Sequence, residues 1–455
     1  MNDQLNFEAG KSVSPVECFG MMFPNERARR EHFLKLLAEK LKDPDFRNIE
    51  GFPVGSDEDI LALSDPPYYT ACPNPFIEDF VQYYGKPYVP EVLYSKEPFA
   101  ADVSEGKNDP VYNAHSYHTK VPHKAIMRYI LHYTQPGDVV FDGFCGTGMT
   151  GVAAQLCGNK KAIESLGFRV DSEGNVLEQI QENGRNAWKA VSKWGERRAI
   201  LNDLSPFASF ISSRYNDFKT IDYQSNPLLD SLLGSDTTHR DFYTTNGPKN
   251  DTERPIDYII WSEVFSCPSC QHEDPLFDLS VDRATGQMLD EFLCPSCGKA
   301  LKKGDLERVW ISTLDIDGRS FLKEAKAVPV EIVAKIAGRN TRFEPTEYDL
   351  ELASSFDNNP LDGVPDATFP HGRQTRKVKT GSGIEKVHQM FTRRALQFIS
   401  DAWRVASTNS ATRAGRTALF LLSGKRGVAH QVSEWCDTGF VDHLMSMLMQ
   451  HGFHV

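Results

Sequence analysis

Residues 139–151 of the 455-residue chain read VVFDGFCGTGMTG, and this segment is the most informative about the fold. A short apolar run ends at Asp142, and Gly143, Gly146 and Gly148 follow before a helix-forming segment. Glycine lets a backbone turn sharply and approach a ligand closely, and a helix N-terminus presents free N–H groups. The stretch therefore predicts a buried strand, a glycine-rich turn and a helix that together bind a cofactor.

The turn is not a Walker loop, because Met149 and Thr150 stand where the lysine and the Ser or Thr of that loop would be. A second predicted strand, Arg198–Asp203, also ends in a carboxylate. In a doubly wound sheet a carboxylate at this place accepts hydrogen bonds from ribose hydroxyls. Glycine-rich turns also bind dinucleotides and phosphates, so these features alone leave the cofactor open.

A second motif, Asp65-Pro66-Pro67-Tyr68, ends an apolar run that we interpret as a strand entering a loop, over Ile60–Tyr69. Two prolines fix the backbone and leave a carbonyl that can accept a hydrogen bond from a substrate amino group. The aspartate can accept a second one, and the tyrosine ring offers a stacking face for a base. Two such acceptors would stabilise the charge that develops when an exocyclic amine attacks a methyl sulfonium. The alternative interpretation is a chance turn.

Four cysteines form two CxxC pairs, Cys267 with Cys270 and Cys294 with Cys297, and 23 residues separate the pairs. Tetrahedral zinc takes four thiolates, and two such knuckles supply two each. We expect structural Zn2+ here and not disulfides, which are rare in cytoplasmic proteins. Acidic residues between the knuckles favour a fold-stabilising or protein-contacting module over one that reads bases.

The motifs together resemble the DNA amino-methyltransferases, which methylate adenine-N6 or cytosine-N4 with S-adenosyl-L-methionine. SDPPYY at 64–69 is similar to their catalytic motif, the stretch at 139–151 to their cofactor turn, and NDLSP at 202–206 to the acid that holds the ribose. SYHTKVPHKAI at 116–126 is similar to the segment that closes over the cofactor. The motif order is that of a permuted methyltransferase, and the cysteines resemble those of the large bacterial zinc-ribbon DNA methylases.

The resemblance implies an α/β fold, a Rossmann-like S-adenosylmethionine-dependent methyltransferase sheet with an inserted zinc ribbon. It also assigns roles to individual residues. The implied catalytic residues are Asp65, Pro66, Pro67 and Tyr68, and the implied cofactor-binding residues are Thr119, Lys120, Asp142, Gly143, Phe144, Gly146, Gly148 and Asp203.

One departure from that family bears on the catalytic motif. Only 46 residues separate Tyr69 from Ser116, too few for the remaining strands of the sheet and a target-reading domain, and a second DPP-aromatic motif is missing. Either the sequence after the zinc module completes the sheet, or half of the enzyme is absent and a second protein subunit supplies it.

A formal charge of −12 argues against a protein that coats nucleic acid everywhere, but one segment is strongly basic. Between His371 and Ala395 seven Lys and Arg residues stand against one acid. Such a run can neutralise the phosphates of double-stranded DNA, and the alternative is a solvated face. The candidate DNA-binding residues are Arg373, Arg376, Lys377, Lys379, Arg393 and Arg394.

Several helices and turns are predicted outside these motifs. The periodicity predicts helices over Asn25–Leu41 and Lys124–Thr134, and a small hairpin around Glu173. Helical spacing also runs from Ile384 to Ala402, with Arg393 and Arg394 expected off its apolar stripe. We expect a methyltransferase core over 1–225, a zinc ribbon over 255–305, and a C-terminal region over 306–455 that contacts DNA or completes the core.

The expected function is methylation of an exocyclic amino group of a DNA base, with adenine-N6 preferred and cytosine-N4 as the alternative target. A non-catalytic subunit that binds cofactor and DNA is the competing hypothesis, and methylation of rRNA or of a protein glutamine is a third. No leader or stretch of roughly 18 apolar residues stands out, so we expect a cytoplasmic protein without a membrane partner.

Overall fold

The structure, a computed structural model, describes residues 15–217 and 243–424, apart from 88, 92, 116, 118–119, 183, 250–251, 284, 358–360, 362–363 and 365. The chain divides into two compact units. Of the described residues, unit 1 contains 15–217 and 407–424, and unit 2 contains 243–406. No helix in these described ranges has the length and apolar character needed to cross a membrane.

The first part of unit 1 folds around a core of its own. Helix α1 covers Glu26–Lys40, as predicted, because the Asn25 side chain accepts a hydrogen bond from the Ala28 N–H at 2.9 Å and caps its first turn. Phe33, Leu37 and Ile60 are among the buried core residues. The other elements of this part are β1 (Val16–Cys18), β2 (Met21–Phe23), α2 (Pro44–Arg47), α3 (Asp57–Leu63) and α4 (Ile77–Tyr84).

The predicted strand over Ile60–Tyr69 is wrong, because its first half belongs to helix α3. The Ser56 hydroxyl accepts a hydrogen bond from the Asp59 N–H at 3.1 Å, and acidic residues fill the first turn, where the helix dipole favours them. The chain then reverses, and the backbones of Asp65 and Tyr69 pair across the two prolines. The DPPY motif therefore lies in a tight turn after a helix.

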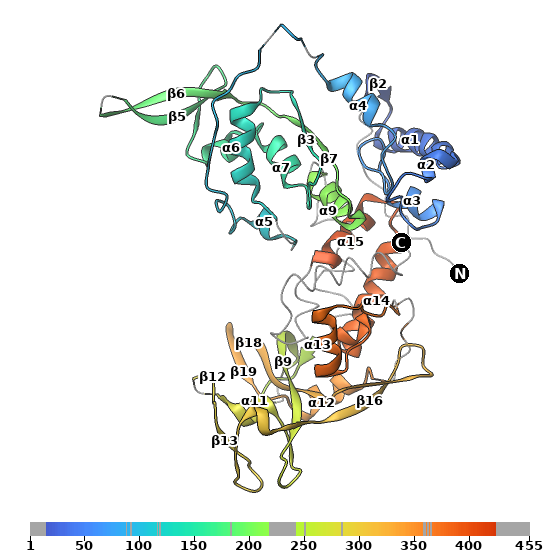
Figure 1. The fold of residues 1–455 in the computed structure, drawn as a ribbon, viewed down its shortest axis with the longest axis vertical. Helices are drawn as coiled ribbons and strands as arrows, with labels where there is room; N and C mark the ends of the chain where they lie inside the picture. Colours follow the sequence, from blue (N-terminus) through green and yellow to red (C-terminus); the bar gives the residue numbers. More distant parts are fainter. Residues whose placement is uncertain are drawn as a thin grey trace. The chain divides into compact units, whose positions relative to one another are not determined.

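The second part of unit 1 contains the predicted strand, glycine turn and helix. Strands β3 (Val139–Asp142) and β7 (Arg198–Leu201) run parallel, so the acids at their carboxyl ends share one edge. Figure 1 shows α6 and α7 beside this pair. The remaining elements are α5 (Pro110–Asn113), α6 (His123–Tyr133), α7 (Met149–Leu156), α8 (Lys160–Glu164), β4 (Arg169–Val170), β5 (Asn175–Glu182), β6 (Arg185–Lys193), α9 (Pro206–Asn216) and α15 (Arg413–Gly424).

The helix predicted over Lys124–Thr134 is α6, and the predicted hairpin is the antiparallel sheet β4-β5-β6, from which β5 and β6 extend away from the rest of unit 1 in Figure 1. The complete doubly wound sheet that the resemblance implied is not formed by the described residues. There the parallel sheet consists of β3 and β7 alone, because the chain before and after them forms helices, hairpins and irregular segments.

Helix α9 packs so closely on the glycine turn that side chains are excluded there. A Cβ at Gly148 would lie 2.1 Å from Ser212 Oγ, and a Cβ at Gly151 would lie 2.3 Å from Asn216 Oδ1. The Asn216 amide donates to the Gly148 carbonyl at 3.1 Å and accepts from Gln155 at 3.0 Å. These glycines are therefore required by helix packing, whatever ligand the turn binds.

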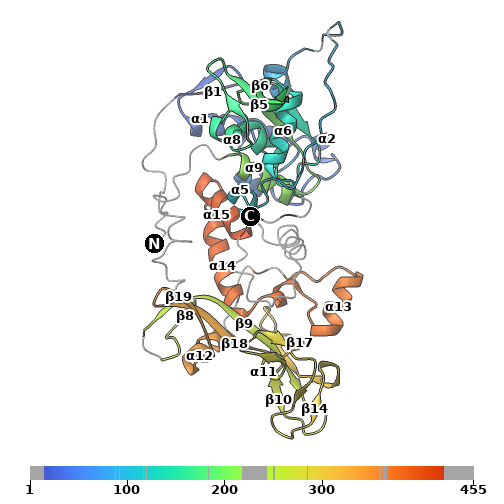
Figure 2. The ribbon, with the colours of Figure 1, turned by 90° about the vertical axis from the view of Figure 1, so that its left-hand side faces the viewer.

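Unit 2 is built on an antiparallel sheet with the order β10-β9-β18-β19, in which β8 and β15 also pair with β9. Figure 2 shows β9 and β18 side by side in this sheet. The strands of unit 2 are β8 (Thr244–Thr245), β9 (Arg254–Ser266), β10 (Glu273–Pro275), β11 (Val281–Asp282), β12 (Gln287–Met288), β13 (Phe292–Leu293), β14 (Ala300–Leu301), β15 (Glu307–Arg308), β16 (Trp310–Leu314), β17 (Phe321–Ala325), β18 (Ala327–Ile336) and β19 (Arg339–Phe343).

The helices of unit 2 differ from the prediction at one place. They are α11 (Leu276–Ser280), α12 (Glu347–Ser354), α13 (Arg373–Ser382) and α14 (Arg393–Thr408), the last extending two residues into unit 1. The predicted helix from Ile384 begins only at Arg393, after a short 3-10 turn. Arg394 is not off the apolar stripe, because it is 2% exposed and its guanidinium lies 4.7 Å from the Tyr243 ring.

We expect Gly148→Ala to destabilise unit 1 by about 2–4 kcal/mol, because the residue has a φ of +74° and its Cβ would collide with α9. Gly174→Ala is the matched control, since its φ is +80° but the nearest atom, in Trp194, is 3.9 Å away. Chemical denaturation of both variants measures the difference. If both variants lost the same free energy of unfolding, a steric clash of the Gly148→Ala side chain with α9 would be ruled out.

Candidate functional site

Two carboxylates hold the backbone of the glycine turn in place. Asp142 accepts hydrogen bonds from the Phe144 N–H at 3.2 Å and from the Thr150 hydroxyl at 2.5 Å. Asp203 accepts from the Gly146 N–H at 2.8 Å and from the Ser205 N–H at 2.9 Å. Both acids thus fix the backbone of the turn, and remaining lone pairs on their oxygens can still accept from a ligand.

Large apolar side chains lie exposed around the same edge of the strands. Phe141 is 70% exposed, Phe144 is 81% exposed and Leu204, next to Asp203, is 84% exposed. Ligands of open α/β sheets bind outside the carboxyl ends of the strands. The edge therefore offers apolar faces beside carboxylates, which suits a molecule with a planar base and a hydroxylated sugar.

The segment before the turn is attached to α9 by Lys120. Its ammonium contacts the Tyr112 carbonyl, the His115 carbonyl at 2.9 Å and the Tyr215 hydroxyl at 3.1 Å. These protein acceptors use the three donors of the ammonium, so Lys120 ties this segment to α9, and its predicted role at a cofactor stays a prediction. Thr119, the other residue predicted here, lies outside the described residues.

The DPPY turn is surrounded by arginines. Arg29 Nη2 donates to Asp65 Oδ1 at 2.8 Å, and Arg29 Nη1 donates to the Pro66 carbonyl at 2.5 Å. Arg416 Nη2 lies 3.6 Å from the other Asp65 oxygen. Burial raises the pKa of the Asp65 carboxyl, but the positive charges of Arg29, Arg416 and Arg214 outweigh it and lower the pKa below its usual range. Asp65 is therefore an ionised, ion-paired carboxylate.

The other residues of the motif are held by the protein as well. The Asn74 amide donates to the Pro67 carbonyl at 2.9 Å. The Tyr68 side chain remains 53% exposed, and the Arg29 guanidinium lies 4.8 Å from the centre of its ring. Burial is the main reason that the pKa of the Tyr68 hydroxyl is raised.

One side of helix α9 contacts the glycine turn, and Arg214 on its other side lowers the pKa of Asp65. Ser212 and Asn216 face Gly148, whereas Arg214 is among the charges that lower the Asp65 pKa. Residues two apart on a helix point to opposite sides. The two predicted halves of the active site thus lie in one unit, yet the carboxylate of Asp65 faces arginines here and not the turn.

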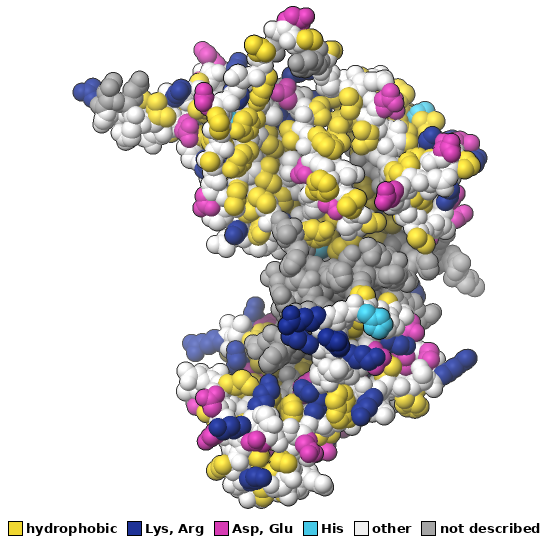
Figure 3. Space-filling view, viewed as in Figure 1, with side chains coloured by type: hydrophobic (Ala, Val, Ile, Leu, Met, Phe, Trp, Pro, Cys, Tyr) yellow, Lys and Arg dark blue, Asp and Glu magenta, His cyan; other side chains and the backbone are white. Residues whose placement is uncertain are grey.

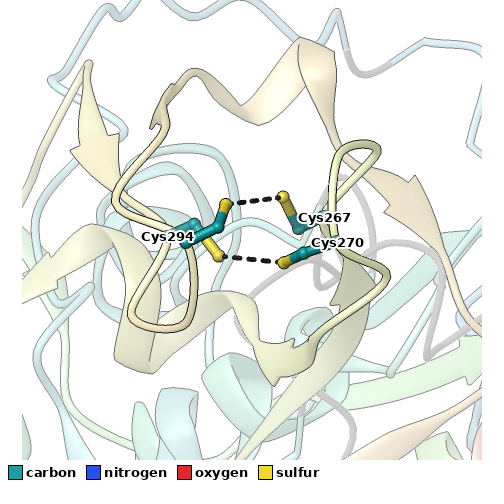
Figure 4. Close-up of side chains that lie close together, drawn as sticks. Cys267, Cys270 and Cys294 are labelled. Carbon is teal, nitrogen blue, oxygen red and sulfur yellow. Dashed lines mark hydrogen bonds between the residues drawn. The ribbon is translucent and has the colours of Figure 1, made fainter.

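The four predicted zinc ligands come together in unit 2. Figure 4 shows the sulfur atoms of the two knuckles pointing toward one another. Cys267 Sγ lies 3.9 Å from Cys297 Sγ, and Cys270 Sγ lies 3.6 Å from Cys294 Sγ. A tetrahedral zinc with bonds of about 2.3 Å needs sulfurs about 3.8 Å apart, whereas a disulfide needs about 2.0 Å. The geometry is compatible with zinc and not with disulfides.

Both knuckles form the same backbone turn. The N–H of the residue after the second cysteine, Gln271 or Gly298, donates to the carbonyl of the first cysteine at 2.8 or 2.9 Å. These two residues have φ values of +59° and +71°. Backbone N–H groups in the first knuckle, with the Ser269 contribution largest, lower the pKa of Cys267, whereas burial and the neighbouring thiols raise the pKa of Cys297. The four thiols thus share their protons unequally, and Cys267 is the one that is favoured as a thiolate, the form that binds metal.

The basic run lies mainly on one helix. Arg373, Arg376, Lys377 and Lys379 are exposed on α13, and Lys379 pairs with Glu385 at 3.0 Å. Figure 3 shows Lys and Arg side chains gathered over this helix. Arg393 is half-buried and donates to the Asp357 carbonyl at 3.3 Å. With Arg394 buried, the exposed cations among these candidate residues lie on α13.

A further charged cluster in unit 2 was missed from the sequence. The Lys386 ammonium lies 2.7 Å from Asp315 Oδ2 and 2.7 Å from Asp366 Oδ1, and His388 Nε2 lies 3.0 Å from Asp315 Oδ1. The lysine fills the place that a cation would take between the carboxylates. Only its position beside a D-x-D-G turn could have indicated it, and such turns are common.

One comparison with known proteins finds a match. Residues 95–182 match the family model described as DNA methylase, of the N6/N4 methyltransferase type. The match supports a DNA amino-methyltransferase that acts on adenine-N6 or cytosine-N4, and with it an S-adenosylmethionine-dependent methyltransferase fold. It includes the glycine turn, whereas Asp65, Asp203 and the four cysteines of the CxxC pairs lie outside it. No curated protein and no solved structure is significantly similar to the chain.

For the cysteine cluster we expect one tightly held zinc ion per chain. Cys267→Ser should remove the metal and lower the melting temperature of unit 2, because binding energy at such sites contributes to folding. Cys72→Ser, a change outside the cluster, is the control. Metal analysis of protein purified without added zinc decides this: less than about half an equivalent, with no effect of Cys267→Ser, would contradict the site.

Asp203→Ala should weaken cofactor binding by about 1.5–3 kcal/mol and loosen the turn, because a charged acceptor for two N–H groups is lost. Asp203→Asn keeps one acceptor oxygen and should lose less. Calorimetry with S-adenosylmethionine and thermal melting measure the two effects. Unchanged affinity in both variants would exclude a role for this carboxylate.

Proposed function

We propose that the chain methylates an exocyclic amino group of a DNA base with S-adenosyl-L-methionine, with adenine-N6 as the target. The match to the DNA methylase family carries this proposal, because the matched segment contains the glycine turn. Adenine is preferred over cytosine-N4 because the aspartate form of the DPPY motif is commoner among the adenine enzymes that the sequence resembles.

The edge formed by β3 and β7 is the proposed cofactor site. S-adenosylmethionine, when bound, supplies an electrophilic methyl group. The remaining lone pairs of Asp203 would accept from the ribose hydroxyls, and the exposed Phe144 and Leu204 would cover the base. The donor set fits, since a nucleoside needs carboxylate acceptors for its sugar and apolar faces for its ring.

The DPPY turn is the proposed site of the target amine. The Asp65 carboxylate and the Pro66 carbonyl would accept hydrogen bonds from the amine, and Tyr68 would stack on the base. A paired base is buried in the duplex, so it must be flipped out, at a cost of a few kcal/mol. The exposed cations of α13 would bind phosphates of double-stranded DNA, and zinc at the four cysteines would have a structural role.

A second candidate function is a cofactor- and DNA-binding subunit that needs a partner chain for activity. One observation favours it: Asp65 and Pro66 are engaged by Arg29, and in the described residues the parallel sheet has two strands. A partner that supplied further strands would then bring its own catalytic motif. Methylation of rRNA or of a protein glutamine has no observation in its favour.

We expect N6-methyladenine in mixed-sequence duplex DNA after incubation with the protein and S-adenosylmethionine, detected by mass spectrometry of the digested DNA. Asp65→Ala should lower turnover on the order of a hundredfold, because one oriented polar group at the reacting centre is lost. Glu58→Ala, at an exposed acid on α3, is the control, and melting temperatures check folding.

The outcomes separate the candidates. Methylation only on RNA, or on a cytosine carbon, would overturn the proposal. A chain that is inactive alone and active with a second protein would favour the subunit hypothesis. A fully active Asp65→Ala variant would place the chemistry at another motif.

A further inference from the structure

The contacts of Arg29 match those that the proposed function assigns to a target base. One N–H of its guanidinium donates to the Asp65 carboxylate at 2.8 Å, and another donates to the Pro66 carbonyl at 2.5 Å. The same group lies 4.8 Å from the centre of the Tyr68 ring. Both acceptors and the aromatic face of the motif are thus taken by one side chain.

A guanidinium resembles the amino edge of adenine or cytosine in the respects that matter here. It is planar and carries N–H donors in a fixed fork, and it stacks on aromatic rings. The side chain of Arg29 is 4% exposed, so this group fills its place and excludes water.

We propose that Arg29 occupies the target-base pocket of this chain and that a flipped base must displace it. The inference rests on the proposed function, since it takes the DPPY turn as the place of the target amine. It adds an internal competitor: the pocket is closed by the protein's own arginine until a base with an exocyclic amine enters.

Displacement of Arg29 is feasible because its neighbours do not depend on it alone. Arg416 lies 3.6 Å from the second oxygen of Asp65, so the carboxylate keeps a positive partner when Arg29 leaves. The guanidinium is also close to the surface, since Tyr68 beside it is 53% exposed and the side chain of its other partner, Glu26, is 62% exposed.

The adjacent Arg30 supplies a matched control. Its guanidinium donates to the carbonyl oxygens of Ser64 at 2.8 Å and Ala62 at 3.2 Å, at the end of helix α3. Its Nε lies 3.9 Å from Asp65 Oδ1, well beyond the 2.8 Å that separates Arg29 from the same oxygen. Arg30 stabilises the helix end, and its loss does not vacate the pocket.

The test measures nucleoside binding to the full chain by calorimetry. We expect Arg29→Ala to bind 2′-deoxyadenosine and 2′-deoxycytidine about tenfold more tightly than the wild type, because the closed fraction of the pocket no longer reduces the apparent affinity. Thymidine, which lacks an exocyclic amine, should gain nothing. Methylguanidinium should compete with 2′-deoxyadenosine for Arg29→Ala, because it refills the vacated space.

Arg29→Met keeps the length of the side chain without its donors, and it gives the answer if Arg29→Ala does not fold. Arg30→Ala should lower the melting temperature without any gain in nucleoside affinity. The inference is overturned if neither folded Arg29 variant binds an amine-bearing nucleoside more tightly, or if thymidine gains equally. Nucleoside binding needs no methyl transfer, so failure of the proposed function appears separately, as absence of methylated DNA with the wild type.

Discussion

The close packing of the glycine turn on helix α9 is the constraint on which the rest of unit 1 depends. Gly148 and Gly151 leave no room for a side chain, and Asn216 ties the turn to the helix. The same helix holds the segment before the turn, because the Tyr215 hydroxyl accepts a hydrogen bond from Lys120. Any change in the position of α9 must therefore move the turn and that segment together.

The charges around Asp65 are a second constraint on the structure of unit 1. A buried ion pair adds little net stability, but a buried charge that is left without any partner costs about 3–5 kcal/mol. Asp65 has partners from α1 and α15, which makes the turn dependent on two distant parts of the chain. Such a network favours one arrangement of the motif over others.

The sequence predicted those parts of the molecule that local patterns determine. The strand, turn and helix at 139–151 follow from glycine and apolar spacing, and the cysteine cluster follows from two identical knuckles. Helix α3 was missed because a short apolar run before two prolines is compatible with a strand, and the cap at Ser56 was overlooked.

Long-range contacts were beyond the sequence patterns. Arg29 reaches Asp65 from 36 residues away, and Arg394 packs on Tyr243 although a charged residue is normally expected at the surface. The extent of the parallel sheet was also not predictable, because the resemblance covers motifs and not the segments between them. These features depend on how helices pack, and a pattern in one segment does not encode that.

The late position of helix α15 in the chain has a consequence for synthesis. Arg416 is translated about 350 residues after Asp65, and at roughly 5–20 residues per second this interval lasts about 20–70 seconds on the ribosome. The described residues of unit 2, with the four thiols of the two knuckles, are all synthesised within that time. Arg29 is already present when Asp65 is synthesised, so it can pair with this carboxylate before helix α15 is made.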